Sequence, residues 1–165
     1  MTRRGAACLV LASVGLFATL VAIGGWAGLR LNLTPSHPLG LWRIVPRERE
    51  AAGGAHGVVC PPPQDGLEKG AARGQHQRGL CPGWVGPLIK IVAAGEGQRV
   101  AVGRSVTIDG QPLERSDVRP VDGEGRALVP WSGGVIPTGH LYLHSSFGGS
   151  YDSRYFGPVP AEGVL

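Results

Sequence analysis

A chain of 165 residues has room for one domain of ordinary size together with a membrane anchor, but not for two full domains. It contains 28 glycines and 14 prolines with only 6% aromatic residues, which favours turns and short strands over long helices. The net charge is +4, and the basic residues are scattered without runs or interleaved aromatics, so the composition gives no indication of nucleic-acid binding.

An uncharged, apolar segment runs from Gly5 to Leu29, directly after Arg3 and Arg4. At about 1.5 Å per residue, a helix of this length exceeds the roughly 30 Å hydrocarbon core of a membrane. A cleaved signal peptide is the alternative, but its apolar region usually spans only about 7–15 residues. We therefore predict an uncleaved transmembrane anchor over residues 1–30. The two arginines place the N-terminus in the cytoplasm and residues 31–165 in a domain on the periplasmic side of the inner membrane.

The segment after the anchor contains a serine between two prolines. It reads Thr34-Pro35-Ser36-His37-Pro38, and the prolines keep the backbone on both sides of Ser36 extended. A small hydroxyl on a rigid segment next to a membrane anchor is suited to a nucleophile. The alternative is an ordinary proline-rich linker.

Cys60 and Cys81 bracket a polar, glycine-rich stretch from Gln64 to Gly79, which we expect to be a surface loop with about one helical turn. Outside the cytoplasmic membrane these cysteines could form a disulfide that closes the loop. Two unpaired cysteines remain the alternative. Cys8 lies within the anchor. The sequence has no two cysteines separated by two intervening residues, the spacing typical of zinc ligands, so we predict no metal site.

Residues 88–94 are the most strand-like segment, and apolar residues on both alternate faces predict a strand buried on both sides. Lys90 lies within it, although a buried lysine costs free energy unless it is paired or neutral, or extends its amine to the surface. Asp109-Gly110 indicates a hairpin turn. We predict a small, mostly antiparallel, barrel-like β domain. Its other strands are expected near residues 43–46, 58–59, 100–102, 105–108, 128–131 (at an edge) and 141–144.

Ser36 and Lys90 together suggest nucleophilic catalysis. Burial lowers the pKa of a lysine, so a neutral Lys90 could act as the base for a serine. His37 is a poor base because neighbours in an extended chain point in opposite directions, whereas His144 could meet Ser36 in space and is the alternative base. His140 and His144 are four residues apart, but in a strand this spacing does not form a helical metal pair.

Taken in chain order, these segments resemble the type I signal peptidase family. The matching blocks are the anchor and residues 34–38, 88–92, 109–112, 136–140 and 150–157, of which the last is the most specific. Residues 38–42, the small size and Cys60-Pro61-Pro62 are more similar to the TraF-type branch, the maturation peptidases of conjugative plasmid transfer. The resemblance implies a β-rich fold, a Ser/Lys mechanism without a cofactor, and a protein precursor as substrate. That precursor would be a pilin, and cyclisation of the product is left open.

The resemblance also implies roles for single residues. Ser36 matches the nucleophile and Lys90 the general base. Thr34 matches a hydroxyl that supports the oxyanion, and Ser150 matches a hydroxyl that orients the lysine. Two other functions remain open on the sequence: a general signal peptidase that removes leader peptides, and an inert anchored β domain that binds a periplasmic partner.

Asp152 and Arg154 match the acid and the base of the motif that closes the family pattern. We count Asp152 with the catalytic residues and Arg154 with the supporting ones, although Asp152 could equally be structural. Residues 144–149 depart from the family pattern, in which this stretch is acidic and contains an arginine. The departure puts general signal-peptidase specificity in doubt more than the chemistry.

Overall fold

The computed structural model describes residues 2–33, 38–44, 56–60 and 62–163. The chain divides into two compact units, which we describe separately. The first unit consists of residues 1–33 and 39–45, and the second of residues 34–38 and 46–165.

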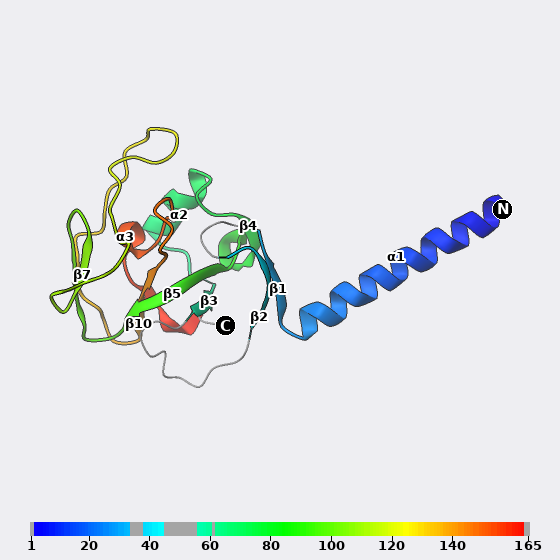
Figure 1. The fold of residues 1–165 in the computed structure, drawn as a ribbon, viewed down its shortest axis with the longest axis horizontal. Helices are drawn as coiled ribbons and strands as arrows, with labels where there is room; N and C mark the ends of the chain where they lie inside the picture. Colours follow the sequence, from blue (N-terminus) through cyan, green and yellow to red (C-terminus); the bar gives the residue numbers. More distant parts are fainter. Residues whose placement is uncertain (1, 34–37, 45–55, 61, 164–165) are drawn as a thin grey trace. The chain divides into compact units, whose positions relative to one another are not determined.

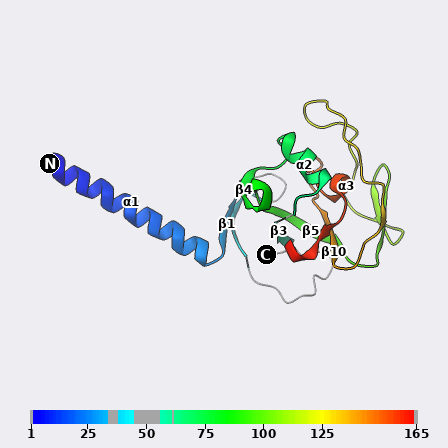
Figure 2. The same ribbon diagram turned by 180° about the vertical axis from the view of Figure 1, so that it is seen from behind.

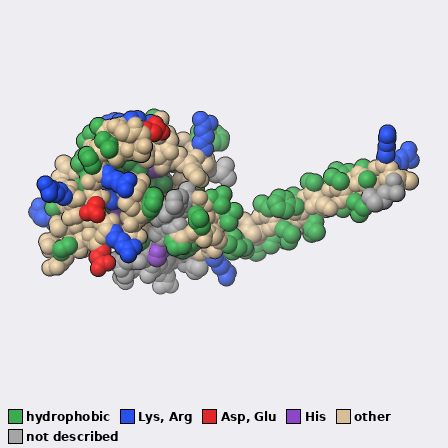
Figure 3. All heavy atoms as spheres, turned by 45° about the horizontal axis from the view of Figure 1, so that its top comes forward, with side chains coloured by type: hydrophobic (Ala, Val, Ile, Leu, Met, Phe, Trp, Pro, Cys, Tyr) green, Lys and Arg blue, Asp and Glu red, His purple; other side chains and the backbone are tan. Residues whose placement is uncertain are grey.

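The first unit begins with helix α1, Arg3–Trp26, which confirms the predicted N-terminal apolar helix. The side chain of Thr2 caps it by accepting a hydrogen bond from the amide of Gly5, at 3.3 Å. Its mean hydropathy is 2.5 and none of its residues is buried, so the helix is long and apolar enough to cross a membrane. Figure 3 shows hydrophobic side chains along the visible face of the helix and basic ones at its N-terminal end.

Strands β1, Leu29–Asn32, and β2, Gly40–Arg43, follow α1 as an antiparallel pair. The turn out of the helix requires Gly28, whose φ is +76° and where a Cβ atom would lie 2.8 Å from the carbonyl oxygen of Ile44. The strand predicted at residues 43–46 thus begins earlier, at Gly40, and ends at Arg43.

The second unit contains two four-stranded sheets, and every strand pair in them is antiparallel (Figure 1). The first has the order β11-β10-β5-β3, with β3 His56–Val59, β5 Leu88–Ala94, β10 His140–His144 and β11 Val159–Pro160. The second has the order β8-β7-β6-β9, with β6 Arg99–Val102, β7 Val106–Ile108, β8 Gln111–Pro112 and β9 Gly134–Val135. The mostly antiparallel fold is confirmed, but the described strands form no closed barrel.

The hydrophobic core consists of two clusters, to both of which β5 and β10 contribute. One cluster consists of Val59, Leu67, Leu88, Val92, Leu141, Leu143, Phe156 and Val159. The other consists of Ala94, Val100, Val106, Ile136 and Tyr142. Strand β5 is confirmed, but only its face with Leu88, Lys90 and Val92 is fully buried, because the alternate residues are partly exposed.

Shorter elements complete the second unit. They are α2 Asp65–Ala72, β4 Arg78–Cys81, the 3₁₀ turns η1 Pro82–Trp84 and η2 Ala161–Gly163, and α3 Ser153–Phe156. Helix α2 occupies eight residues of the loop predicted over residues 64–79, where only about one helical turn was expected. Its glycines permit close packing, since a Cβ atom would lie 2.8 Å from Phe156 at Gly66 and 2.6 Å from Tyr151 at Gly70. Figures 1 and 2 accordingly show α2 beside α3.

Two other sequence predictions have clear outcomes. The hairpin turn is confirmed, because Asp109 and Gly110 have φ of 51° and 80° between the paired strands β7 and β8, as a type I′ turn requires. The edge strand predicted at residues 128–131 is wrong. Leu128 donates its amide to Pro120 and Trp131 donates its amide to Arg154, so this segment bonds to a loop and to α3 instead of to a sheet.

Candidate active site

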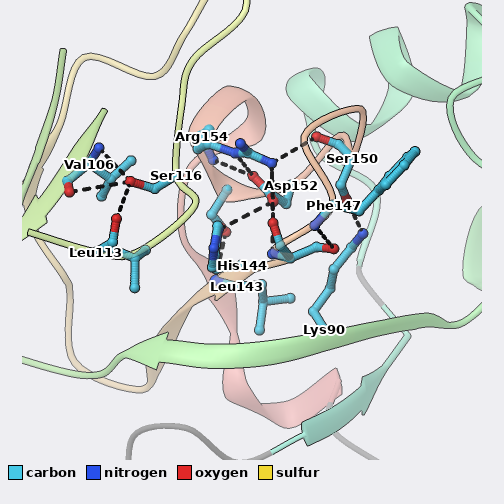
Figure 4. A network of polar contacts seen from close by, with 12 residues as sticks. Lys90, Val106, Leu113, Ser116, Leu143, His144, Phe147, Ser150, Asp152 and Arg154 are labelled. Carbon is cyan, nitrogen blue, oxygen red and sulfur yellow. Dashed lines mark hydrogen bonds and ion pairs between the residues drawn. The ribbon is translucent and has the colours of Figure 1, made fainter. Parts of the chain in front are cut away.

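Lys90 lies in the middle of β5, on its buried face, and is only 4% exposed. Its Nζ donates a hydrogen bond to Ser150 Oγ at 2.6 Å (Figure 4). Burial lowers the pKa of Lys90 to about 8, against the opposing effect of the nearby Asp152 carboxylate and with a smaller lowering by Arg154. A neutral amine is therefore accessible close to neutral pH.

Ser150 is held in place by its own backbone. Its amide donates to the carbonyl oxygen of Phe147 at 2.9 Å, which closes the turn after β10. Its carbonyl oxygen accepts a hydrogen bond from Arg154 Nη2 at 3.2 Å. The backbone of Ser150 is thus held through both its amide and its carbonyl group, and this fixes the position of the hydroxyl that contacts Lys90.

Asp152 and Arg154 form an ion pair that is 0% exposed on both sides. Arg154 Nε lies 2.8 Å from Asp152 Oδ1, and Nη2 lies 2.9 Å from Oδ2 (Figure 4). Asp152 also accepts the amide of Ser145, while Arg154 Nη1 donates to the carbonyl oxygen of Asp117. The pair therefore joins the end of β10, the long loop after β8 and helix α3, and it sets the geometry of the turn that carries Ser150.

A family model described as signal peptidase, peptidase S26, matches residues 1–165. The chain belongs to the S26 signal peptidase family. It is 49% identical over 161 residues to a probable conjugal transfer protein TraF of Sinorhizobium fredii, covering 98% of this chain and 84% of that protein. It is 50% identical to the conjugal transfer protein TraF of Agrobacterium fabrum (98% and 88% covered) and 34% identical to a plasmid transfer protein TraF of Escherichia coli (95% and 89%). The family resemblance seen in the motifs is confirmed, and the N-terminal helix agrees with a single-pass, membrane-anchored member of the S26 family.

Ser36 and Thr34 lie outside the described residues. Of the predicted S26 site residues, the structure brings together Lys90, Ser150, Asp152 and Arg154. They come from β5 and from the segment between β10 and the end of α3, and Lys90 and Ser150 are 60 residues apart in the chain. This S26 cluster is therefore formed by the antiparallel pairing of β5 with β10.

His144, the alternative base, is 3% exposed. Its Nδ1 lies 3.7 Å from Asp152 Oδ2, which is beyond hydrogen-bond distance. Burial lowers the pKa of His144, an effect that the Asp152 charge opposes. Burial therefore favours the neutral imidazole.

His76 is a neighbour of Lys90 that the sequence analysis missed. Its ring meets the ring of Tyr151 edge-on, with 5.5 Å between the centroids. Burial lowers the pKa of His76 to about 4, and the positive charge of Lys90 adds to this effect. The residue lies in the stretch predicted as a polar loop, and no sequence signal there indicated that it would be partly buried.

Cys60 and Cys81 are joined by a disulfide with a Cα–Cα distance of 5.3 Å. The bond connects the residue after β3 to the end of β4, and the intervening chain includes α2. Among the described residues, no group of three histidine, cysteine, aspartate or glutamate side chains could hold a metal ion.

Proposed function

We propose that this chain is a membrane-anchored serine peptidase in which Ser36 is the nucleophile and Lys90 the general base. The observation that carries the proposal is the environment of Lys90: a buried amine with a pKa of about 8, held 2.6 Å from the hydroxyl of Ser150. A base has to be unprotonated to work, and a lysine with this pKa is partly neutral near pH 7. Membership of the S26 family supports the same reaction class.

In the proposed first step, Ser36 Oγ attacks the carbonyl carbon of the scissile peptide bond while neutral Lys90 Nζ takes the hydroxyl proton. The hydroxyl of Thr34 supports the oxyanion of the tetrahedral intermediate. When the C–N bond breaks, the Lys90 ammonium returns its proton to the leaving amine, which leaves an acyl ester on Ser36.

In the second step, Lys90 is neutral again and takes a proton from the incoming nucleophile as it attacks the acyl carbon. The ester bond to Ser36 then breaks, and the Lys90 ammonium returns the proton to Ser36 Oγ. Water as the nucleophile releases a carboxylic acid. An amine of the substrate itself would instead form a new amide and cyclise the product. Throughout, Ser150 holds the amine and the Asp152–Arg154 pair holds the turn of Ser150, so we now assign Asp152 a positioning role rather than proton transfer.

The names of the relatives refer to conjugal and plasmid transfer. We therefore propose that the substrate is a secreted precursor of a conjugative transfer system, namely its pilin subunit, and that it is cleaved on the periplasmic side of the inner membrane. A general signal peptidase is the second candidate, favoured by the family description. To distinguish these two functions, the full-length protein is incubated with pilin precursor and, separately, with an ordinary preprotein, and cleavage of each is measured. The mass of the product then distinguishes hydrolysis from cyclisation.

The decisive test is covalent labelling. The full-length protein in detergent is treated with an activated acyl ester, and the labelled peptide is identified by mass spectrometry. We expect the acyl group on Ser36 in the wild type, and none in Ser36→Ala or Lys90→Ala. An inert binding domain would give no label at Ser36 in any of the three, and that result would overturn the proposal.

A further inference from the structure

A cavity of about 350 Å³ lies beside the candidate active site and has no part in the mechanism above. Its walls come from four places in the second unit: the residues that follow α2, Arg73–Gln75; the loop at residues 119–128; the turn at residues 147–151; and Tyr155 of α3. Ser150 lines it, and the hydroxyl of the same residue contacts Lys90. The cavity and the lysine thus share one residue.

The cavity is lined by more positively charged than negatively charged side chains. Arg126 Nε lies 2.7 Å from Asp122 Oδ2 and its Nη1 lies 3.0 Å from Glu124 Oε2, so one arginine engages both acids of the lining. Arg73 and Arg119 also line the cavity, and the only acceptor that the described residues offer to either guanidinium is the carbonyl oxygen of Ala127, which binds Arg73 Nη1. The lining therefore keeps an excess of positive charge.

The walls are tied to one another, so Arg73 and Arg126 are held in position before any ligand binds. Arg73 Nη1 donates to the carbonyl oxygen of Ala127 at 2.7 Å, and Arg126 Nη2 donates to that of Arg73 at 3.0 Å. The amide of Arg119 donates to Tyr155 Oη at 3.0 Å, which fixes the base of its side chain against α3. A site organised in this way loses less entropy on binding than a flexible one.

We propose that this cavity binds a carboxylate of the peptide substrate, with Arg119 as its main contact and Arg73 contributing to the positive field. A guanidinium binds a carboxylate through two parallel hydrogen bonds, a geometry that suits this group in particular. The exposed ring of Phe147 and the ring of Tyr151 offer apolar surface to the rest of the peptide. The inference builds on the proposed function, because Ser150 connects the cavity to the proposed base.

Binding can be measured without turnover. Full-length Ser36→Ala in micelles, labelled with ¹⁵N-glycine, gives amide signals from Gly74, Gly123, Gly148 and Gly149, all of which line the cavity. It is titrated with three acetylated tetrapeptides: one with a central glutamate and an amidated end, one with glutamine and an amidated end, and one with glutamine and a free C-terminus. The first and third carry a carboxylate at different places, so they distinguish a side chain from a terminus.

We expect at least one carboxylate peptide to shift these glycine signals and to bind about tenfold more tightly than the neutral peptide, which is roughly the effect of one charge-assisted hydrogen bond. Arg119→Gln should abolish that preference. The matched control is Arg104→Gln, an exposed arginine in the turn between β6 and β7, which should keep it. Equal binding of all three peptides, or equal loss in both variants, would overturn the inference. Because Ser36 is absent from the assay, either result is independent of whether Ser36 is acylated.

Discussion

Lys90 differs from Lys69, the other lysine of the chain, in its surroundings: Lys90 is buried beside apolar neighbours and Lys69 is exposed on α2. Below pH 8 the Lys90 amine is mostly protonated and cannot accept a proton, so we expect kcat/KM to fall as the pH drops through about 8. Lys90→Arg should be as inactive as Lys90→Ala, because a guanidinium keeps its proton at working pH.

The measurement is a pH–rate profile of the wild type, with Lys69→Arg as the control that should match it. Substantial turnover by Lys90→Arg would remove Lys90 from the role of base, and His144 would then be the first residue to examine. A midpoint near the ordinary lysine value of about 10.4 would contradict the effect of burial on the pKa.

Ser150 gives a second prediction at this scale. Ser150→Ala removes the hydroxyl that holds Lys90 Nζ, so we expect turnover to fall by a factor of about 10–100 while the protein stays folded. Ser146→Ala, an exposed serine of the same turn, should leave turnover unchanged. Thermal unfolding of both variants accompanies the kinetics, and an unchanged rate for Ser150→Ala would show that the lysine needs no positioning.

Asp152 is expected to matter more for stability than for chemistry. Asp152→Ala leaves the buried Arg154 charge without its partner, which typically destabilises a protein by about 3–5 kcal/mol. We therefore expect a clear drop in Tm, whereas Asp65→Ala, an exposed acid on α2, should change it little. The fraction that still folds should lose much less activity than Ser36→Ala does; complete inactivity with normal stability would make Asp152 a catalytic residue.

Among the elements, those governed by local patterns could be predicted from the sequence. The alternation of residues 88–94 gave β5, and Asp109-Gly110 gave the hairpin of β7 and β8. Helix α2 could not be predicted at its full length, because Gly66 and Gly70 lower helix propensity and are explained only by the close approach of Phe156 and Tyr151.

The candidate site likewise has residues that could be predicted from the sequence and residues that could not. The motifs singled out Lys90, Ser150, Asp152 and Arg154, because their residue types and order resemble those of the family. The partial burial of His76 and the cavity beside Ser150 depend on how distant segments pack together, and no local pattern encodes that packing. Whether Ser36 approaches Lys90 remains a prediction.

The disulfide belongs to the scale of elements, since it closes the segment that contains α2. We expect the pair Cys60→Ser with Cys81→Ser to lose roughly 3 kcal/mol of unfolding free energy, as the loop-entropy model gives for a loop of about this length. Cys8→Ser serves as the control and should be silent. Non-reducing peptide mapping of the protein purified from membranes should recover Cys60 and Cys81 in one linked species, and two free thiols would contradict the pairing.

For the whole molecule, the open question is whether α1 stays attached. Its 24 residues, Arg3–Trp26, exceed the apolar length of a cleaved leader, so we expect the intact mass of the membrane-extracted protein to include residues from Met1 or Thr2 onward. A mature N-terminus near Gly28 would contradict an uncleaved anchor.

The hairpin of β1 and β2 limits how this protein can be simplified for study. Leu31, Leu33, Leu39 and Leu41 are all exposed on it or at its ends, and together they form apolar surface of a kind that promotes aggregation in water. Deleting α1 alone would leave these leucines in place. Because Ser36 lies in the chain between Asn32 and Gly40, any truncation that removes the hairpin also removes the proposed nucleophile. A water-soluble and active version therefore requires polar substitutions at these leucines in addition to the deletion of α1.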